Sequence, residues 1–148
     1  MTSLYTWLRF FHLLGLIVFL LSHGVSGGAS LALRKPASAT SRQLLRLSEL
    51  SGVVAYPALL VLIVTGVWMG FVGHWWGKGW IWASIAVFVA LAVTMRLIAR
   101  PYHMARSATQ EPDGVLNERL RQTRPLTAIW VGSVGLLVLL FLMVFKPF

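Results

Sequence analysis

The chain has 148 residues, of which 57% are hydrophobic and 11% are charged, and its mean hydropathy is +0.76. Soluble domains carry about 25% charged residues, so this composition excludes the soluble globular class and indicates a protein that folds in lipid. Because the chain contains no cysteine, it has no disulfide framework, no thiolate metal site and no nucleophilic thiol.

Four windows are long and apolar enough to cross a bilayer core, which takes about 20 helical residues. They lie at 4–23, 53–72, 80–98 and 126–145. No basic segment precedes the first window, so we interpret it as a retained helix and not as a cleaved signal peptide. The sequence therefore predicts an all-α fold, a transmembrane four-helix antiparallel bundle. We expect one integral-membrane domain over residues 1–148, with cytoplasmic loops at 34–49 and 99–125.

The first window carries two histidines in an otherwise almost wholly apolar run, WLRFFHLLGLIVFLLSH at 7–23. The eleven steps from His12 to His23 turn an α-helix through three revolutions plus about 20°, so the two histidines share one face, about 16 Å apart along the axis. Ionisable groups inside a bilayer usually point into the bundle, toward a partner, a cavity or a cofactor. Gly15 lies one turn after His12 on that face. It leaves room either for a flat macrocycle or for a closely packed helix.

The glycine- and serine-rich residues after the first window favour tight helix packing, and we expect the first helix to continue to about Leu33 and to end at Pro36. The second helix is predicted to begin in the aqueous phase at Thr40 or Ser41, whose side chains are good N-caps. Within it, Pro57 removes one backbone donor and predicts a bend.

Gly66 and Gly70 predict a strip of small residues for helix contact on the second helix. The turn GHWWGKGW at 73–80 is so short that we expect the second and third helices to be antiparallel neighbours. Its tryptophans predict an aromatic belt at the membrane–water interface. The hydrophilic segment after the third helix predicts a turn at 112–114 and a short helix over 115–124, and a last helix follows as scaffold.

The net charge of +9 is distributed unevenly over the two sides of the predicted bundle. If the four windows cross the membrane in alternating directions, all of the 13 lysines and arginines except Arg9, Lys78 and Lys146 fall on one side of the membrane. By the positive-inside rule that side is cytoplasmic. We therefore expect a multi-pass protein of the bacterial inner membrane with both termini on the outer, periplasmic side. The basic excess attracts anionic headgroups of the lipid bilayer, so no nucleic-acid partner is expected.

This topology lets the four histidines meet in two pairs, His12 with His74 near the outer surface and His23 with His103 near the inner one. Two neutral imidazoles from different helices are the usual axial ligands of haem b in a four-helix bundle. His12 and His74 are therefore candidate metal ligands, although their depths differ by about 12 Å unless the second helix tilts. The alternative for each histidine is a ring bonded to a backbone carbonyl, to a tyrosine or to interfacial water.

The runs WLRFFHLLGLIVFLLSHGVSGG, LSELSGVVAYPALLVLIVTGVWMG and WIWASIAVFVALAV, together with the ending VFKPF, resemble the predicted membrane proteins of the HemJ and copper-resistance D grouping. The similarity is closest to the short uncharacterised four-helix branch of that grouping. HemJ proteins oxidise protoporphyrinogen and bind haem, and His12 matches their histidine by its place in Trp-x-x-x-x-His. HemJ proteins have a lysine early in helix 3, whereas the corresponding position in this chain, at about Ser84, is not a lysine. The resemblance therefore does not imply protoporphyrinogen oxidation, and it leaves haem binding open.

The resulting hypothesis is a haem-linked membrane oxidoreductase, in which His12 binds haem b and His23, His74 or His103 is the second ligand or a bystander. Electrons would pass to or from a quinone or a membrane redox partner. One alternative is a non-catalytic accessory or scaffold subunit of a homo- or hetero-oligomer. Another is transport of copper or a small solute, for which His103 and Met104 form the one local pair of soft ligands.

Overall fold

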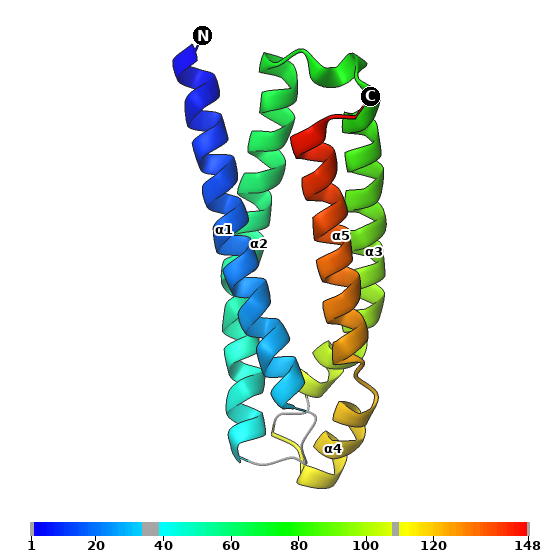
Figure 1. The fold of residues 1–148 in the computed structure, drawn as a ribbon. Coiled ribbons are helices and arrows are strands. Elements are labelled where there is room, and N and C mark those ends of the chain that lie inside the picture. Colours follow the sequence, from blue (N-terminus) through cyan, green and yellow to red (C-terminus); the bar gives the residue numbers. More distant parts are fainter. Residues whose placement is uncertain (1, 34–38, 108–109, 148) are drawn as a thin grey trace.

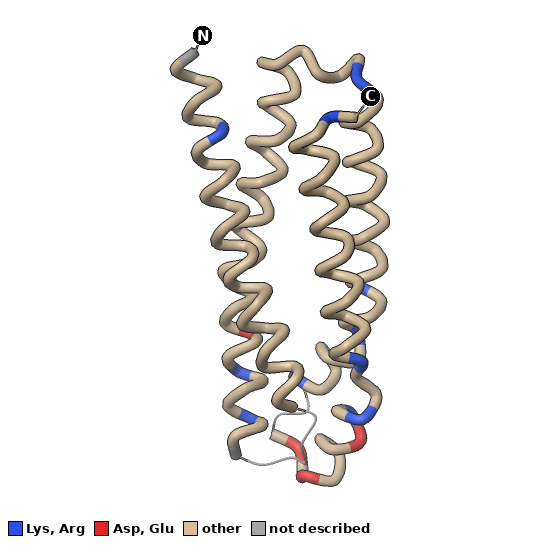
Figure 2. Tube along the Cα trace, viewed as in Figure 1, with Lys and Arg blue, Asp and Glu red and all other residues tan. Residues whose placement is uncertain are grey.

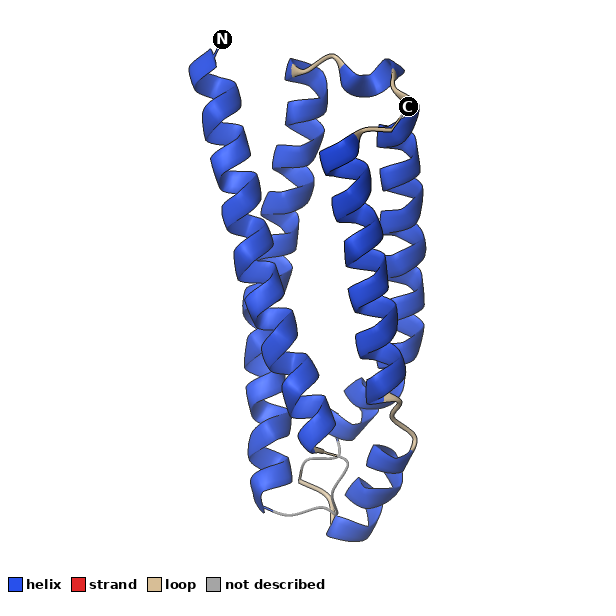
Figure 3. Ribbon diagram, viewed as in Figure 1, coloured by secondary structure: helices blue, strands red, loops and turns tan. Residues whose placement is uncertain are grey.

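The computed structural model describes residues 2–33, 39–107 and 110–147, and within these ranges it contains helices and turns but no strand (Figure 3). The four long helices are α1 (Thr2–Ala32), α2 (Ala39–Val72), α3 (Gly79–Ser107) and α5 (Pro125–Phe145) (Figure 1). A short helix, α4 (Asp113–Arg121), precedes α5, and a 3₁₀ helix, η1 (Trp75–Gly77), links α2 to α3. Each long helix is long and apolar enough to cross a membrane. The predicted all-α bundle with four spans is confirmed.

The helices α1 and α2 have nearly the ends that the sequence indicated. α1 ends at Ala32, and α2 begins at Ala39, next to the predicted caps, and passes through Pro57 as a single helix. The expected end of the first helix at Pro36 lies outside the described residues. Residues 39–49 of the predicted 34–49 loop are therefore helical, and residues 34–38 lie outside the described residues.

The predicted loop at 99–125 is largely helical in the structure. Its first residues complete α3, which contains Pro101, and α4 starts two residues before the predicted short helix. The reason is packing, because Ala105 on the last turns of α3 and Leu116 on α4 are both fully buried. Burial of an apolar helix face stabilises helices that a loop-like composition does not favour.

The four spans associate as two close pairs, α1 with α2 and α3 with α5. Glycine makes each close approach possible. A Cβ atom on Gly15 would lie 3.2 Å from the carbonyl oxygen of Ala58, and one on Gly135 would lie 2.6 Å from Leu91 Cδ1. α2 and α3 contact each other far less, although the connection between them is short. Small-residue contacts, and not loop length, therefore select the partner of α2.

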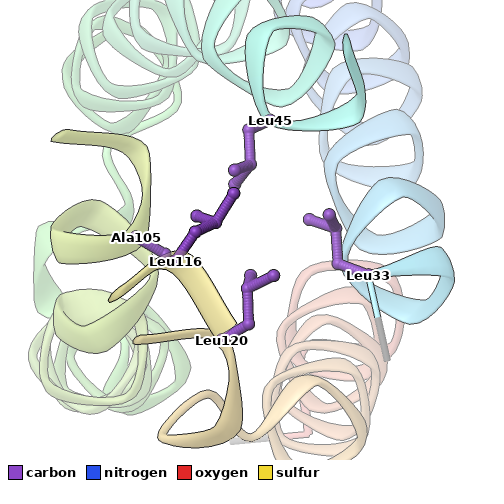
Figure 4. Packing of buried hydrophobic residues seen from close by; sticks show 5 residues of the cluster. All are labelled: Leu33, Leu45, Ala105, Leu116 and Leu120. Carbon is purple, nitrogen blue, oxygen red and sulfur yellow. The ribbon is translucent and has the colours of Figure 1, made fainter. Parts of the chain in front are cut away.

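The two pairs are joined at the end that carries α4. Figure 4 shows side chains from several elements pointing toward one another there: Leu33, Leu45, Ala105, Leu116 and Leu120. Beside this apolar cluster, Nη2 of Arg106 donates to the hydroxyl of Ser48 at 2.8 Å and to its carbonyl oxygen at 2.9 Å. Arg42 of α2 forms an ion pair with Asp113 of α4 at 2.8 Å. This end of the molecule is consequently fixed by both apolar and polar contacts.

We expect the substitution Leu116→Ala to lower the free energy of unfolding by about 2–5 kcal/mol, because Leu116 is fully buried and alanine would leave a cavity in this apolar cluster. The measurement is thermal or denaturant unfolding of the detergent-solubilised protein, followed by the loss of helical circular dichroism. The neighbouring Val115 is 44% exposed, so Val115→Ala is the matched control and should cost about 0.5 kcal/mol or less. Equal losses for the two variants would contradict the assignment of this cluster as the core.

Candidate functional site: the histidines of the first span

The imidazole of His12 contacts α2 at Thr65. His12 Nδ1 lies 2.9 Å from the Thr65 hydroxyl oxygen, and the ring is half-buried. The Thr65 hydroxyl donates its single proton to the carbonyl oxygen of Val61, at 2.6 Å. Because that proton is used there, we infer that the hydroxyl accepts from His12 and that Nδ1 carries the hydrogen. In this assignment the lone pair of the ring is on Nε2.

Two glycines determine how closely the ring fits against α2. A Cβ atom on Gly66 would lie 3.3 Å from His12 Cε1, so the absence of a side chain there makes room for the imidazole. Gly15 is buried one turn along α1, and the space beside it is taken by the backbone of Ala58 and the side chain of Val61. Of the two roles predicted for Gly15, the structure uses it for helix packing.

His23 has different neighbours, because at its level α1 faces α5. His23 Nε2 lies 3.4 Å from the position that a Cβ atom on Gly132 would take. Phe19 stacks on the His23 ring with centroids 5.6 Å apart and an interplanar angle of 18°. Met95 of α3 also lies near this point, with its Cε 3.9 Å and its sulfur 4.0 Å from that Cβ position. Side chains from α1 and α3 therefore pack against α5 at Gly132.

The other two histidines are exposed and distant from these positions. His74 lies in the turn before η1 with φ of 54°, in the left-handed region. It follows Thr65 by nine residues, which corresponds to about 13 Å of helical rise. His103 lies on α3 eight residues, or about 12 Å, beyond Met95. The structure thus brings neither His12 and His74 nor His23 and His103 together, and the described residues contain no cluster of three or more histidine or acidic groups that could hold a metal.

Several residues around the histidines were not singled out by the sequence. Thr65 offered a usable signal, because it is the only serine or threonine in the apolar window 53–72. Met95 and Gly132 offered none, since each is an ordinary residue of its own helix. Their position near His23 depends on how α1, α3 and α5 pack together.

Comparison with known proteins places this architecture in a family. Residues 6–147 match the DUF2269 family, described as a predicted integral membrane protein. The chain belongs to the DUF2269 family. None of the curated proteins and none of the solved structures matches it. The family description supports a membrane protein and does not name the HemJ or copper-resistance D grouping, so that finer resemblance stays a prediction.

At the opposite end from α4, this DUF2269 protein gathers aromatic rings around a lysine. The ammonium of Lys146 lies 4.3 Å from the ring centroid of Trp75 and 5.4 Å from that of Trp80. Tyr5 packs edge-on against Trp75 at 6.1 Å. These cation–π and ring contacts tie the ends of α1 and α5 to the connection between α2 and α3. The tryptophan-rich turn therefore links helices at this end of the bundle.

We expect the substitution Thr65→Val to abolish the tautomer preference of His12, because valine keeps the volume but removes the hydrogen-bond acceptor. The loss of one bond should lower the free energy of unfolding by about 1 kcal/mol. ¹⁵N NMR of the protein in lipid reports the protonation of each ring nitrogen and checks the result. Thr94→Val on α3 is the control and should leave the His12 signals unchanged. A protonated Nε2 in the parent protein would contradict the assignment.

Proposed function

We propose that this DUF2269 protein is a haem-binding protein of the bacterial inner membrane, in which Nε2 of His12 is an axial ligand of haem b. The observation that carries the proposal is the bond from His12 Nδ1 to Thr65, which leaves Nε2 with its lone pair. Histidines that bind metals usually donate their other ring nitrogen to a protein oxygen, which fixes both tautomer and orientation. A mid-membrane imidazole prepared in this way is suited to a ligand role.

The donor set fits a haem with one histidine ligand better than the two-histidine arrangement expected from the sequence. His74 and His103 are exposed at the ends of their helices, and His23 faces α5 about 16 Å along α1 from His12. Thr65 would orient the ligand ring, and Gly66 leaves the space on α2 that the ring itself occupies. When bound, the haem would supply one-electron chemistry, with a quinone or a membrane redox partner as the electron donor or acceptor.

The absorbance spectrum of the protein purified from haem-replete cells tests this proposal. We expect a Soret band that His12→Ala abolishes, because the only axial ligand would be lost. His103→Ala removes an exposed histidine and is the matched control, so its band should be unchanged. Helical circular dichroism of both variants separates ligand loss from misfolding.

Two outcomes would contradict the haem proposal. One is a colourless parent protein, and the other is a spectrum that His12→Ala leaves unchanged. A colourless protein that copurifies with a larger membrane complex would instead support the accessory-subunit alternative.

We further propose that both termini lie on the periplasmic side. Figure 2 shows the basic residues concentrated toward the end of the molecule that carries α4, with few at the end where the termini lie. All four acidic residues, Glu49, Glu111, Asp113 and Glu118, also belong to α2 and the α4 region. An excess of lysine and arginine marks the cytoplasmic side of inner-membrane proteins.

Because the chain contains no cysteine, single-cysteine variants report this orientation directly. We expect Lys78→Cys, in the turn before α3, to react with a membrane-impermeant maleimide in intact spheroplasts. Gln122→Cys, after α4, should react only after the membrane is permeabilised. The reverse pattern would show that the termini are cytoplasmic.

A further inference from the structure

A groove between α3 and α5 plays no part in the haem proposal. It has a volume of about 480 Å³, which is within the range of small-molecule sites. Both helices line it, with Ala90, Leu91, Thr94, Trp130, Val134 and Gly135 among the lining residues. Its floor is the contact between Leu91 and Gly135, where a Cβ atom on the glycine would lie 2.6 Å from Leu91 Cδ1. The groove is therefore almost wholly apolar along its length.

The groove lies on the side of α5 that faces away from α1. Ile129 is the residue of α5 that packs on α1, with its Cγ1 3.7 Å from the Cβ position of Gly27. Successive residues of a helix are about 100° apart, so Trp130 and Val134 lie roughly 100° and 140° around α5 from Ile129. They are 70% and 51% exposed, respectively. The groove therefore opens toward the bilayer and can take a lipid from it.

Arg124 lies where the groove approaches α4. It is the N-cap residue of α5 and precedes Val131 and Gly135, which line the groove, by seven and eleven residues. Both intervals return to nearly the same face of a helix, so Arg124 lies on the groove side of α5. Its side chain is exposed, and within the described part of the chain it forms no hydrogen bond or ion pair. The apolar groove thus ends at a positive charge that the described protein does not neutralise.

We propose that the α3–α5 groove binds one acyl chain of an anionic phospholipid whose phosphate is held by Arg124. An apolar groove by itself accepts the chain of any lipid, so the charge at its end selects the headgroup. Basic pockets between transmembrane helices bind anionic headgroups in this way. Trp130 lies about 9 Å of helical rise from Arg124, so its ring packs along the part of the chain nearest the headgroup.

The same charges make a second copy of the chain a poorer occupant of the groove. Arg119, Arg121 and Arg124 lie within six residues of one another, and Glu118 is the one acidic residue beside them. Figure 2 shows basic residues gathered toward this end of the molecule. In a symmetric dimer packed through the groove, both copies would bring these arginines to one depth of the membrane, where like charges repel. A lipid phosphate would neutralise them instead.

Native mass spectrometry of the full-length protein, released from detergent with equal amounts of phosphatidylglycerol and phosphatidylcholine, tests the site. We expect the parent to retain one phosphatidylglycerol per chain in preference to phosphatidylcholine. Arg124→Gln should reduce this preference about fivefold, which is the contribution of one arginine near an anionic headgroup. Ala90→Phe places a ring in the groove, so it should remove the retained adduct of either lipid.

Each variant has a control that makes the same change elsewhere. Arg46→Gln removes an exposed arginine from α2, and Ala92→Phe adds a ring at an exposed position of α3 that does not line the groove. Both should retain lipid as the parent does, and helical circular dichroism shows whether each variant folds.

Three results would overturn the proposal. They are equal retention of the two lipids by the parent, unchanged retention in either groove variant, and a dimer that Ala90→Phe dissociates, since a second copy would then occupy the groove. The groove does not include His12, so His12→Ala should retain lipid as the parent does. Failure of the haem proposal and failure of this one are therefore distinguishable.

Discussion

A histidine inside a lipid bilayer has to be satisfied by protein, and the hydrogen bond from His12 to Thr65 meets that requirement where α1 contacts α2. The contact depends on Gly15 and Gly66. A side chain at the first would crowd the backbone of α2, and one at the second would crowd the imidazole. Helices in lipid gain no hydrophobic driving force from association, so close packing and interhelical hydrogen bonds hold them together. The hydrogen bond that joins the two helices is thus also the contact that orients the His12 ring.

The second pair, α3 with α5, is built on the same packing rule, and the described hydrogen bonds include none between its helices. Leu91 occupies the space that a side chain on Gly135 would need. The two pairs are then joined near their ends, by Arg106 with Ser48 at the end that carries α4 and, at the other end, by Trp75, which contacts both Tyr5 of α1 and Lys146 after α5. Between the pairs, α1 contacts α5 and α2 contacts α3 much less than the helices contact each other within a pair, and the approach of His23 to Gly132 is one of these contacts.

The class of fold followed from the sequence because a long apolar run has one solution in lipid, a helix with every backbone group paired internally. The choice of helix partners was harder to predict. The short turn at 73–80 suggested that the second and third helices pack together, whereas Gly15 on α1 and Gly66 and Thr65 on α2 make α1 the partner of α2. The prominence of His12 could be seen in the sequence, since an ionisable group stands out in an apolar run. Its tautomer could not, because it depends on the proton that Thr65 gives to Val61.

The two histidines on one face of α1 show how position along a helix decides chemistry. Where α1 packs on α2, the Thr65 hydroxyl lies 2.9 Å from Nδ1 of His12 and orients the ring. About three turns further on, the same face meets α5 at Gly132, and Phe19 stacks on the imidazole of His23. The two imidazoles share a face of one helix, yet the first is held by a hydrogen bond to a neighbouring helix and the second by ring stacking and close packing.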